Sequence, residues 1–103
     1  MEKILIIDDD KWIRMMLKET LLKEGYAVIE ADGGEQGLEI VKSVHPDLVI
    51  TDFQMPGIDG LEVLAEIQKL KIDLPVILLT GFGDVVLTIK SIQVGALDRK
   101  SVV

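Results

Sequence analysis

Residues 4–10 read Ile-Leu-Ile-Ile-Asp-Asp-Asp, an unbroken apolar run that ends in three acidic residues. Such a run is typical of a strand that is buried on both faces of a parallel sheet. Asp10 is suited to cap a helix that follows the strand. The pattern recurs where residues 48–50 lead into Thr51-Asp52 and where residues 76–79 lead into Thr80. The sequence therefore predicts buried strands that end in polar side chains.

The segments between these strands have helical periodicity. Apolar residues spaced by four, at Ile13, Leu17 and Leu21, predict a helix that ends before Gly25. Similar spacing predicts helices over residues 33–44, 61–70 and 84–94, and in the second of these Leu61, Leu64, Ile67 and Leu70 are expected to face inward. Residues 26–30 are less uniformly apolar, which indicates an edge strand. Repeated strand–helix alternation predicts an α/β fold with a doubly wound parallel sheet.

The composition narrows the class of protein. The chain has 103 residues, which fits a single domain, and 49% of them are hydrophobic, too many for a disordered acidic segment. The net charge of −7 argues against a nucleic-acid-binding face, and no apolar run approaches the roughly 20 residues of a membrane span. The absence of cysteine excludes disulfides and thiol chemistry. We therefore expect a soluble cytoplasmic domain.

Polar side chains follow three of the predicted strands. Asp8 and Asp9 follow the first strand, Asp52 the third and Thr80 the fourth. Parallel sheets bind ligands at the carboxyl ends of their strands, so these side chains are expected to share one crevice. Carboxylates gathered there repel one another, and Mg²⁺ relieves the repulsion, with a backbone carbonyl after Asp52 as a further ligand. A carboxylate beside Mg²⁺ and a hydroxyl can act as a nucleophile toward a phosphoryl group.

Each of these residues also has an ordinary structural interpretation. The acidic triplet can serve only as a helix cap, Asp52 can be a loop residue and Thr80 can be a plain strand end. Their coincidence at three parallel strand ends favours a Mg²⁺-dependent phosphate site. The residues alone leave both interpretations open.

Several motifs together resemble the receiver domain of bacterial two-component response regulators. They are Lys3-Ile4-Leu5-Ile6-Ile7-Asp8-Asp9-Asp10, Leu48-Val49-Ile50-Thr51-Asp52, Met55-Pro56-Gly57, Asp59-Gly60, residues 75–80 and Gly95-Ala96. The resemblance extends from about Lys3 to Leu97. It implies the flavodoxin-like (βα)5 fold of that family, with sheet order 2-1-3-4-5.

The resemblance also implies roles for individual residues. Asp52 would accept a phosphoryl group from a sensor histidine kinase or a phosphotransfer protein. Asp8 and Asp9 would hold Mg²⁺ together with Asp52 and the backbone carbonyl of Gln54. Thr80 would bind the phosphoryl oxygen and switch the conformation. The residues expected to flank the site are Gln54, Gly81 and Phe82. The chain would then be a phosphoacceptor signalling domain and not an enzyme, with an unknown effector and no direct contact with nucleic acid or membrane.

The C-terminal residues depart from the family pattern. The family's essential lysine would fall at Val102, and Lys100, two residues earlier, is not assigned its role. The last strand and helix are therefore expected to be missing or incomplete. Residues 98–103 match the translation of a common sequencing-adapter sequence. We accordingly interpret residues 1–103 as one receiver domain that is native-like to about residue 97, with a non-native tail and a longer native chain.

Two alternative functions follow from the same residues. A pseudo-receiver, used only for protein docking, is consistent with the absent lysine. A phosphohydrolase of the haloacid-dehalogenase type would use Asp8 as nucleophile and Asp10 two residues later. In that pattern Trp12 stands where Thr or Val is expected, and residues 52–57 have no role.

Overall fold

A computed structural model describes residues 2–79 of the chain. Several predictions fall outside this range. They concern Thr80, Gly81, Phe82, Lys100 and Val102, the helix over residues 84–94, and the fifth strand and helix of the receiver fold.

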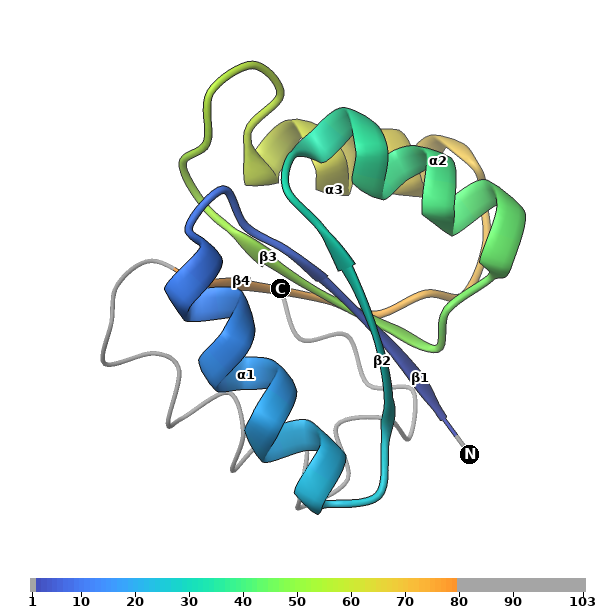
Figure 1. Cartoon of the computed structure of the whole chain (residues 1–103). Helices are drawn as coiled ribbons and strands as arrows, with labels where there is room; N and C mark the ends of the chain where they lie inside the picture. Colours follow the sequence, from blue (N-terminus) through green and yellow to red (C-terminus); the bar gives the residue numbers. More distant parts are fainter. Residues whose placement is uncertain (1, 80–103) are drawn as a thin grey trace.

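The described residues form a parallel four-stranded sheet with helices on both faces (Figure 1). In chain order the elements are β1 (Lys3–Ile7), α1 (Lys11–Lys23), β2 (Ala27–Ala31), α2 (Gly34–Val44), β3 (Leu48–Asp52), α3 (Gly60–Lys69) and β4 (Val76–Leu79). The sheet order is β2-β1-β3-β4, and α1 covers one face while α2 and α3 cover the other. The predicted doubly wound parallel sheet is thus confirmed, and β2 lies at an edge as expected.

The central strand β1 supplies both halves of the core because its side chains alternate between the faces of the sheet. Ile4 and Ile6 pack with Leu17 and Leu21 of α1. Leu5 and Ile7 belong to the opposite layer, with Val41 of α2 and with Val63 and Ile67 of α3. All four apolar residues of β1 have no exposed surface. Burial on both faces explains why residues 4–7 of this strand are all apolar.

The buried face of α3 differs from the prediction. Val63 and Ile67 are buried, Leu64 is partly buried, and Leu61 and Leu70 are 47% and 38% exposed. The helix begins with a capping box, in which Asp59 accepts a bond from the backbone of Glu62, whose carboxylate accepts one from the backbone of Asp59. Gly60, the first residue of the helix, lies against the Asp52 carbonyl at the end of β3. Val63 and Ile67, three and seven positions later, lie on the same side of the helix and are buried, whereas Leu61 is on another side.

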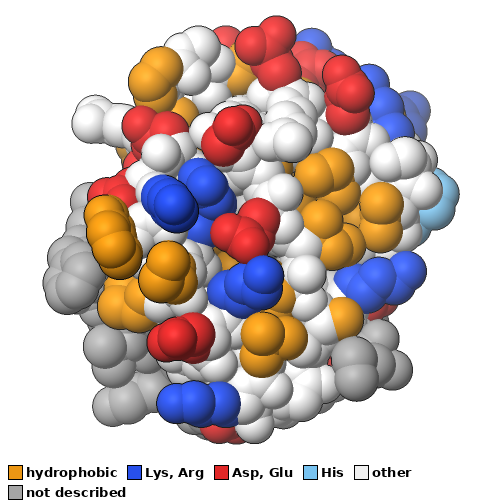
Figure 2. All heavy atoms as spheres, viewed as in Figure 1, with side chains coloured by type: hydrophobic (Ala, Val, Ile, Leu, Met, Phe, Trp, Pro, Cys, Tyr) orange, Lys and Arg blue, Asp and Glu red, His pale blue; other side chains and the backbone are white. Residues whose placement is uncertain are grey.

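Trp12, near the start of α1, is 73% exposed. The face of the molecule in Figure 2 carries scattered hydrophobic side chains between charges of both signs. Within residues 2–79, no helix combines the length and the apolar character needed to cross a bilayer.

The first prediction tests the layer between α1 and the sheet. Leu17→Ala is expected to lower the free energy of unfolding by about 2–5 kcal/mol, because it leaves a cavity in a fully buried site. Leu22→Ala, on the exposed side of the same helix, is the matched control and is expected to change it by less than about 0.5 kcal/mol. Urea-induced unfolding followed by circular dichroism measures both. Equal losses would contradict the assignment of the buried face.

Candidate functional site

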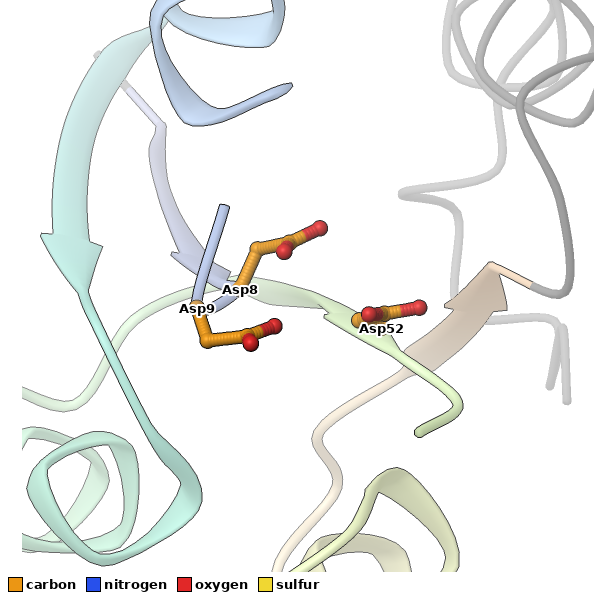
Figure 3. Close-up of side chains that lie close together, drawn as sticks. All are labelled: Asp8, Asp9 and Asp52. Atoms are coloured by element: carbon orange, nitrogen blue, oxygen red, sulfur yellow. The ribbon is translucent and has the colours of Figure 1, made fainter. Parts of the chain in front are cut away.

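Three carboxylates meet where β1 and β3 end side by side. Asp8 follows the last residue of β1, Asp9 comes next, and Asp52 is the last residue of β3. The two strands are hydrogen-bonded neighbours, with Ile7 opposite Thr51. Ligand oxygens of Asp8, Asp9 and Asp52 all lie within 4.8 Å of one another. Figure 3 shows the three side chains directed into the same space beyond the strand ends.

Backbone hydrogen bonds fix the turn that carries Asp8 and Asp9. The Asp8 amide donates to the carbonyl of Ala31 at 3.1 Å, which extends the pairing with β2 by one residue. The Asp8 carboxylate accepts a bond from the amide of Asp10 at 2.8 Å. Asp10 caps α1 as predicted, accepting from the amides of Trp12 and Ile13. Asp10 is therefore engaged in the helix cap, whereas Asp8 and Asp9 are directed toward Asp52.

The loop after β3 holds Asp52 from its other side. The Asp52 carboxylate accepts a bond from the amide of Phe53 at 2.8 Å, and the carbonyl of Phe53 accepts one from Gly60 at 2.9 Å. Gly60 lies so close that a Cβ atom there would overlap the carbonyl oxygen of Asp52. Glycine is therefore the residue that lets the start of α3 close against the end of β3.

The electrostatics of the cluster are unfavourable to three negative charges. Burial raises the pKa of Asp8 from 3.8 to about 6; the bond from Asp10 opposes this shift, and the nearby charges of Asp52 and Asp9 add to it. The pKa of Asp52 is also raised, first by burial and then by the charge of Asp9, against the opposing bonds from the amides of Phe53 and Gln54. A cation among the carboxylates would offset both the burial and the repulsion.

The donor set fits a hard divalent cation. Carboxylate oxygens are the ligands that Mg²⁺ prefers, and it usually keeps several waters alongside one or two carboxylates. Asp9 is exposed and Asp52 is partly exposed, which leaves room for such waters. Gln54 is exposed in the same loop, so the assignment of its carbonyl as a ligand stays a prediction.

Arg14 also contacts the site, and the sequence did not predict this contact. Its guanidinium donates to the backbone carbonyl of Asp8 at 2.7 Å and pairs with Glu30 of β2 at 3.3 Å. The only sequence signal is that Arg14 follows the cap residue Asp10 by four positions, on the same side of the helix. That spacing is common to many surface helices and does not indicate a role.

The doubly wound sheet, with a carboxylate cluster at the ends of two adjacent strands, defines an α/β protein with a candidate cation site at the carboxyl ends of its strands. The model of the response regulator receiver domain family matches residues 4–99. The chain belongs to this family.

Similar proteins support the assignment. The chain is 42% identical to sporulation initiation phosphotransferase F of Bacillus subtilis over 98 residues, covering 95% of this chain and 79% of that protein. It is 45% identical to the probable transcriptional regulator ycf27 of Porphyridium aerugineum, covering 94% of this chain but only 40% of that longer protein. Among solved structures, the chain is similar to the response regulator TrrA of Thermotoga maritima in complex with Mg²⁺ and BeF. The sequence identity is 46% and the TM-score is 0.76, and the match covers 88% of this chain and 79% of TrrA. TrrA has also been solved in complex with the histidine kinase ThkA, with 50% identity and a TM-score of 0.74 over 80% of this chain and 71% of that one.

The second prediction concerns the pH dependence of stability without divalent cations. Because the pKa of Asp8 is raised in the folded state, stability from its protonated form is fully present below pH 3.8 and is lost as the pH rises through about 6. Asp8→Asn keeps the acceptor for Asp10 and removes the charge. It is expected to raise the free energy of unfolding at neutral pH by roughly 1–3 kcal/mol. Urea unfolding in EDTA across this pH range measures the difference.

The control for this prediction is Glu39→Gln, which removes one exposed carboxylate from α2. It is expected to change stability by less than about 0.5 kcal/mol at any of these pH values. If Asp8→Asn and Glu39→Gln raised the free energy of unfolding equally, the effect would come from the net charge of −7 and not from the carboxylate cluster.

Proposed function

We propose that this domain accepts a phosphoryl group on Asp52 in a Mg²⁺-dependent reaction. The observation that carries the proposal is the approach of Asp8 and Asp9 oxygens to those of Asp52, all within 4.8 Å at the end of β3. Asp52 is only partly buried, so a donor can reach it. Membership of the receiver family supports the same role, as does the similarity to TrrA, which was solved with Mg²⁺ and BeF.

Asp8, Asp9 and Asp52 would hold the cation, with the carbonyl of Gln54 as a further ligand. When bound, Mg²⁺ would supply positive charge that offsets the repulsion between the carboxylates and the incoming phosphoryl oxygens. The chain supplies the positioning. The amides of Phe53 and Gln54 face the Asp52 carboxylate and oppose the rise of its pKa, which favours its ionised form.

The proposed reaction is an in-line displacement at phosphorus. An Asp52 carboxylate oxygen attacks the phosphorus of a phosphohistidine, the new O–P bond forms, and the N–P bond breaks. The electron pair of the broken bond returns to the imidazole nitrogen, which takes up a proton from solvent. The product is an acyl phosphate on Asp52. The domain is thus modified stoichiometrically, and we class it as a phosphoacceptor signalling domain and not as an enzyme.

The proposed donor is a sensor histidine kinase or a phosphotransfer protein. The structure of TrrA with the kinase ThkA and the name of the Bacillus relative support this partner class. We assign the reaction to the cytoplasm and propose that the signal leaves the domain by protein contact, without nucleic acid or membrane. Thr80 as switch, with Gly81 and Phe82 beside it, stays part of the proposal.

The two alternatives are less well supported. A haloacid-dehalogenase mechanism needs the carboxylate of Asp10 to be free, but Asp10 caps α1 through the amides of Trp12 and Ile13. A pseudo-receiver would not be phosphorylated, so the phosphorylation experiment below distinguishes it from the main proposal.

The third prediction tests the phosphoacceptor. Phosphoramidate, a small mimic of phosphohistidine, is expected to add one phosphoryl group to the chain in the presence of Mg²⁺ and none in EDTA. Asp52→Asn removes the nucleophilic oxygen and is expected to abolish the adduct. Intact-mass spectrometry, with hydroxylamine to cleave an acyl phosphate, provides the measurement.

The matched control is Asp59→Asn, in the same loop. Asn also serves as a helix cap, so this variant is expected to keep both α3 and the adduct. Phosphorylation that persists in Asp52→Asn, or that never occurs in the unmodified chain, would refute the proposal. The latter result would favour the pseudo-receiver.

The fourth prediction tests the cation site directly. Mg²⁺ is expected to shift the amide signals of residues 8–10 and 52–54 in a ¹H–¹⁵N correlation spectrum. Asp9→Asn is expected to weaken Mg²⁺ binding at least about tenfold, since even outer-shell substitutions at metal sites cost that much. Glu39→Gln again serves as the control for net charge. Shifts confined to other segments would place the cation elsewhere.

A further inference from the structure

Arg14 links α1, β2 and the turn formed by residues 8–10, which we call the acidic turn. It lies in α1, and its side chain is only 17% exposed. Nη1 donates to the carbonyl oxygen of Asp8 at 2.7 Å, and Nε pairs with Oε1 of Glu30 on β2 at 3.3 Å. Lys18, one turn further along α1, pairs with the other oxygen of Glu30 at 3.2 Å. Figure 2 shows basic and acidic side chains next to one another on the side of the molecule where α1 and β2 lie.

The contact to Asp8 is made to the peptide unit that sets the direction of the acidic turn. Asp8 lies one residue beyond β1, and its carbonyl belongs to the peptide that joins it to Asp9. A hydrogen bond from a charged donor is stronger than a neutral one, and the planar guanidinium can bind two partners at once. Arg14 therefore holds this peptide against both α1 and β2.

We propose that Arg14 is a positioning residue for the cation site, acting through the Asp8–Asp9 peptide to orient both carboxylates. The inference rests on the proposed function, because it assigns Arg14 a part in the same Mg²⁺ site. Glu30 completes the arrangement by fixing the other side of the guanidinium. Outer-shell groups of this kind orient metal ligands in many sites.

Removal of the Arg14 side chain is expected to change the Mg²⁺ affinity in opposite directions, depending on whether its charge or its positioning contact matters more. A nearby positive charge repels Mg²⁺, so its loss alone would strengthen cation binding. Loss of a positioning contact would weaken binding. Lys18 provides the matched comparison, because it is also a cation on α1 paired with Glu30, and its ion pair in the described part of the chain does not involve Asp8.

The experiment compares Arg14→Gln, Arg14→Lys and Lys18→Gln in the full chain. Mg²⁺ affinity is measured by titration of the amide signals. Arg14→Gln is expected to weaken binding about tenfold, at the low end for an outer-shell group because it acts through the backbone. Lys18→Gln is expected to bind Mg²⁺ as tightly as the unmodified chain or slightly more tightly. Arg14→Lys is expected to be intermediate, since one ammonium does not reproduce the two-partner geometry.

A second readout needs no metal. In EDTA, the Asp10 amide, which donates to the Asp8 carboxylate, is expected to exchange with solvent faster in Arg14→Gln than in Lys18→Gln. The amide of Leu5, in the core of β1, serves as the internal reference for global stability.

The two readouts separate the possible failures. The positioning role is overturned if Arg14→Gln binds Mg²⁺ as tightly as Lys18→Gln. It is also overturned if the Asp10 amide exchanges with solvent at the same rate in the two variants. If the unmodified chain binds no Mg²⁺, the proposed function fails, and the exchange comparison alone decides whether Arg14 orders the acidic turn.

Discussion

The crowding of three carboxylates at the end of two adjacent strands is the constraint on which the rest of the structure depends. It arises because β1, buried on both faces, lies between β2 and β3, and the acidic residues that follow it therefore emerge beside Asp52. Hydrophobic burial along four apolar residues drives that placement, and the unfavourable charge at its end is small by comparison. The result is a site where negative charge is held in place by the core, with the pKa of Asp8 raised to about 6.

Short-range backbone contacts then decide what each acidic residue can do. Consecutive aspartates have different tasks: the Asp8 carboxylate accepts from Asp10, and the Asp10 carboxylate caps α1. On the other strand, the close approach of Gly60 to the Asp52 carbonyl keeps α3 against the end of β3. Asp10 is thus engaged in the helix cap, whereas oxygens of Asp8, Asp9 and Asp52 lie within 4.8 Å of one another.

The sequence predicts the parts of the fold that depend on unbroken patterns. The buried strands, their parallel direction and the meeting of Asp8, Asp9 and Asp52 follow from apolar runs and strand-end chemistry, whereas the order of the strands is implied by the resemblance to the receiver family. The inward face of α3 does not, because Leu61 and Val63 both fit a helical period and the choice between them depends on the packing of Gly60 against the end of β3. Arg14 could not be predicted either, since its role depends on Glu30 and Asp8, which three-dimensional packing brings together. The roles of Thr80 and of the residue at the lysine position lie beyond residues 2–79 and stay predictions.

The electrostatics of the cluster have a consequence for the proposed signalling step. The proposed phosphorylation would replace the single charge of the Asp52 carboxylate with a group that carries about −1.5 to −2. The added charge lies beside Asp8 and Asp9, which are already unfavourably close, so the modified site has a greater need for a cation than the unmodified one. Cation binding and phosphorylation are therefore coupled with positive sign, and thermodynamic linkage requires that each favours the other equally. Under the proposed function, the repulsion that the fold imposes on three aspartates is what makes the acyl phosphate responsive to the bound metal.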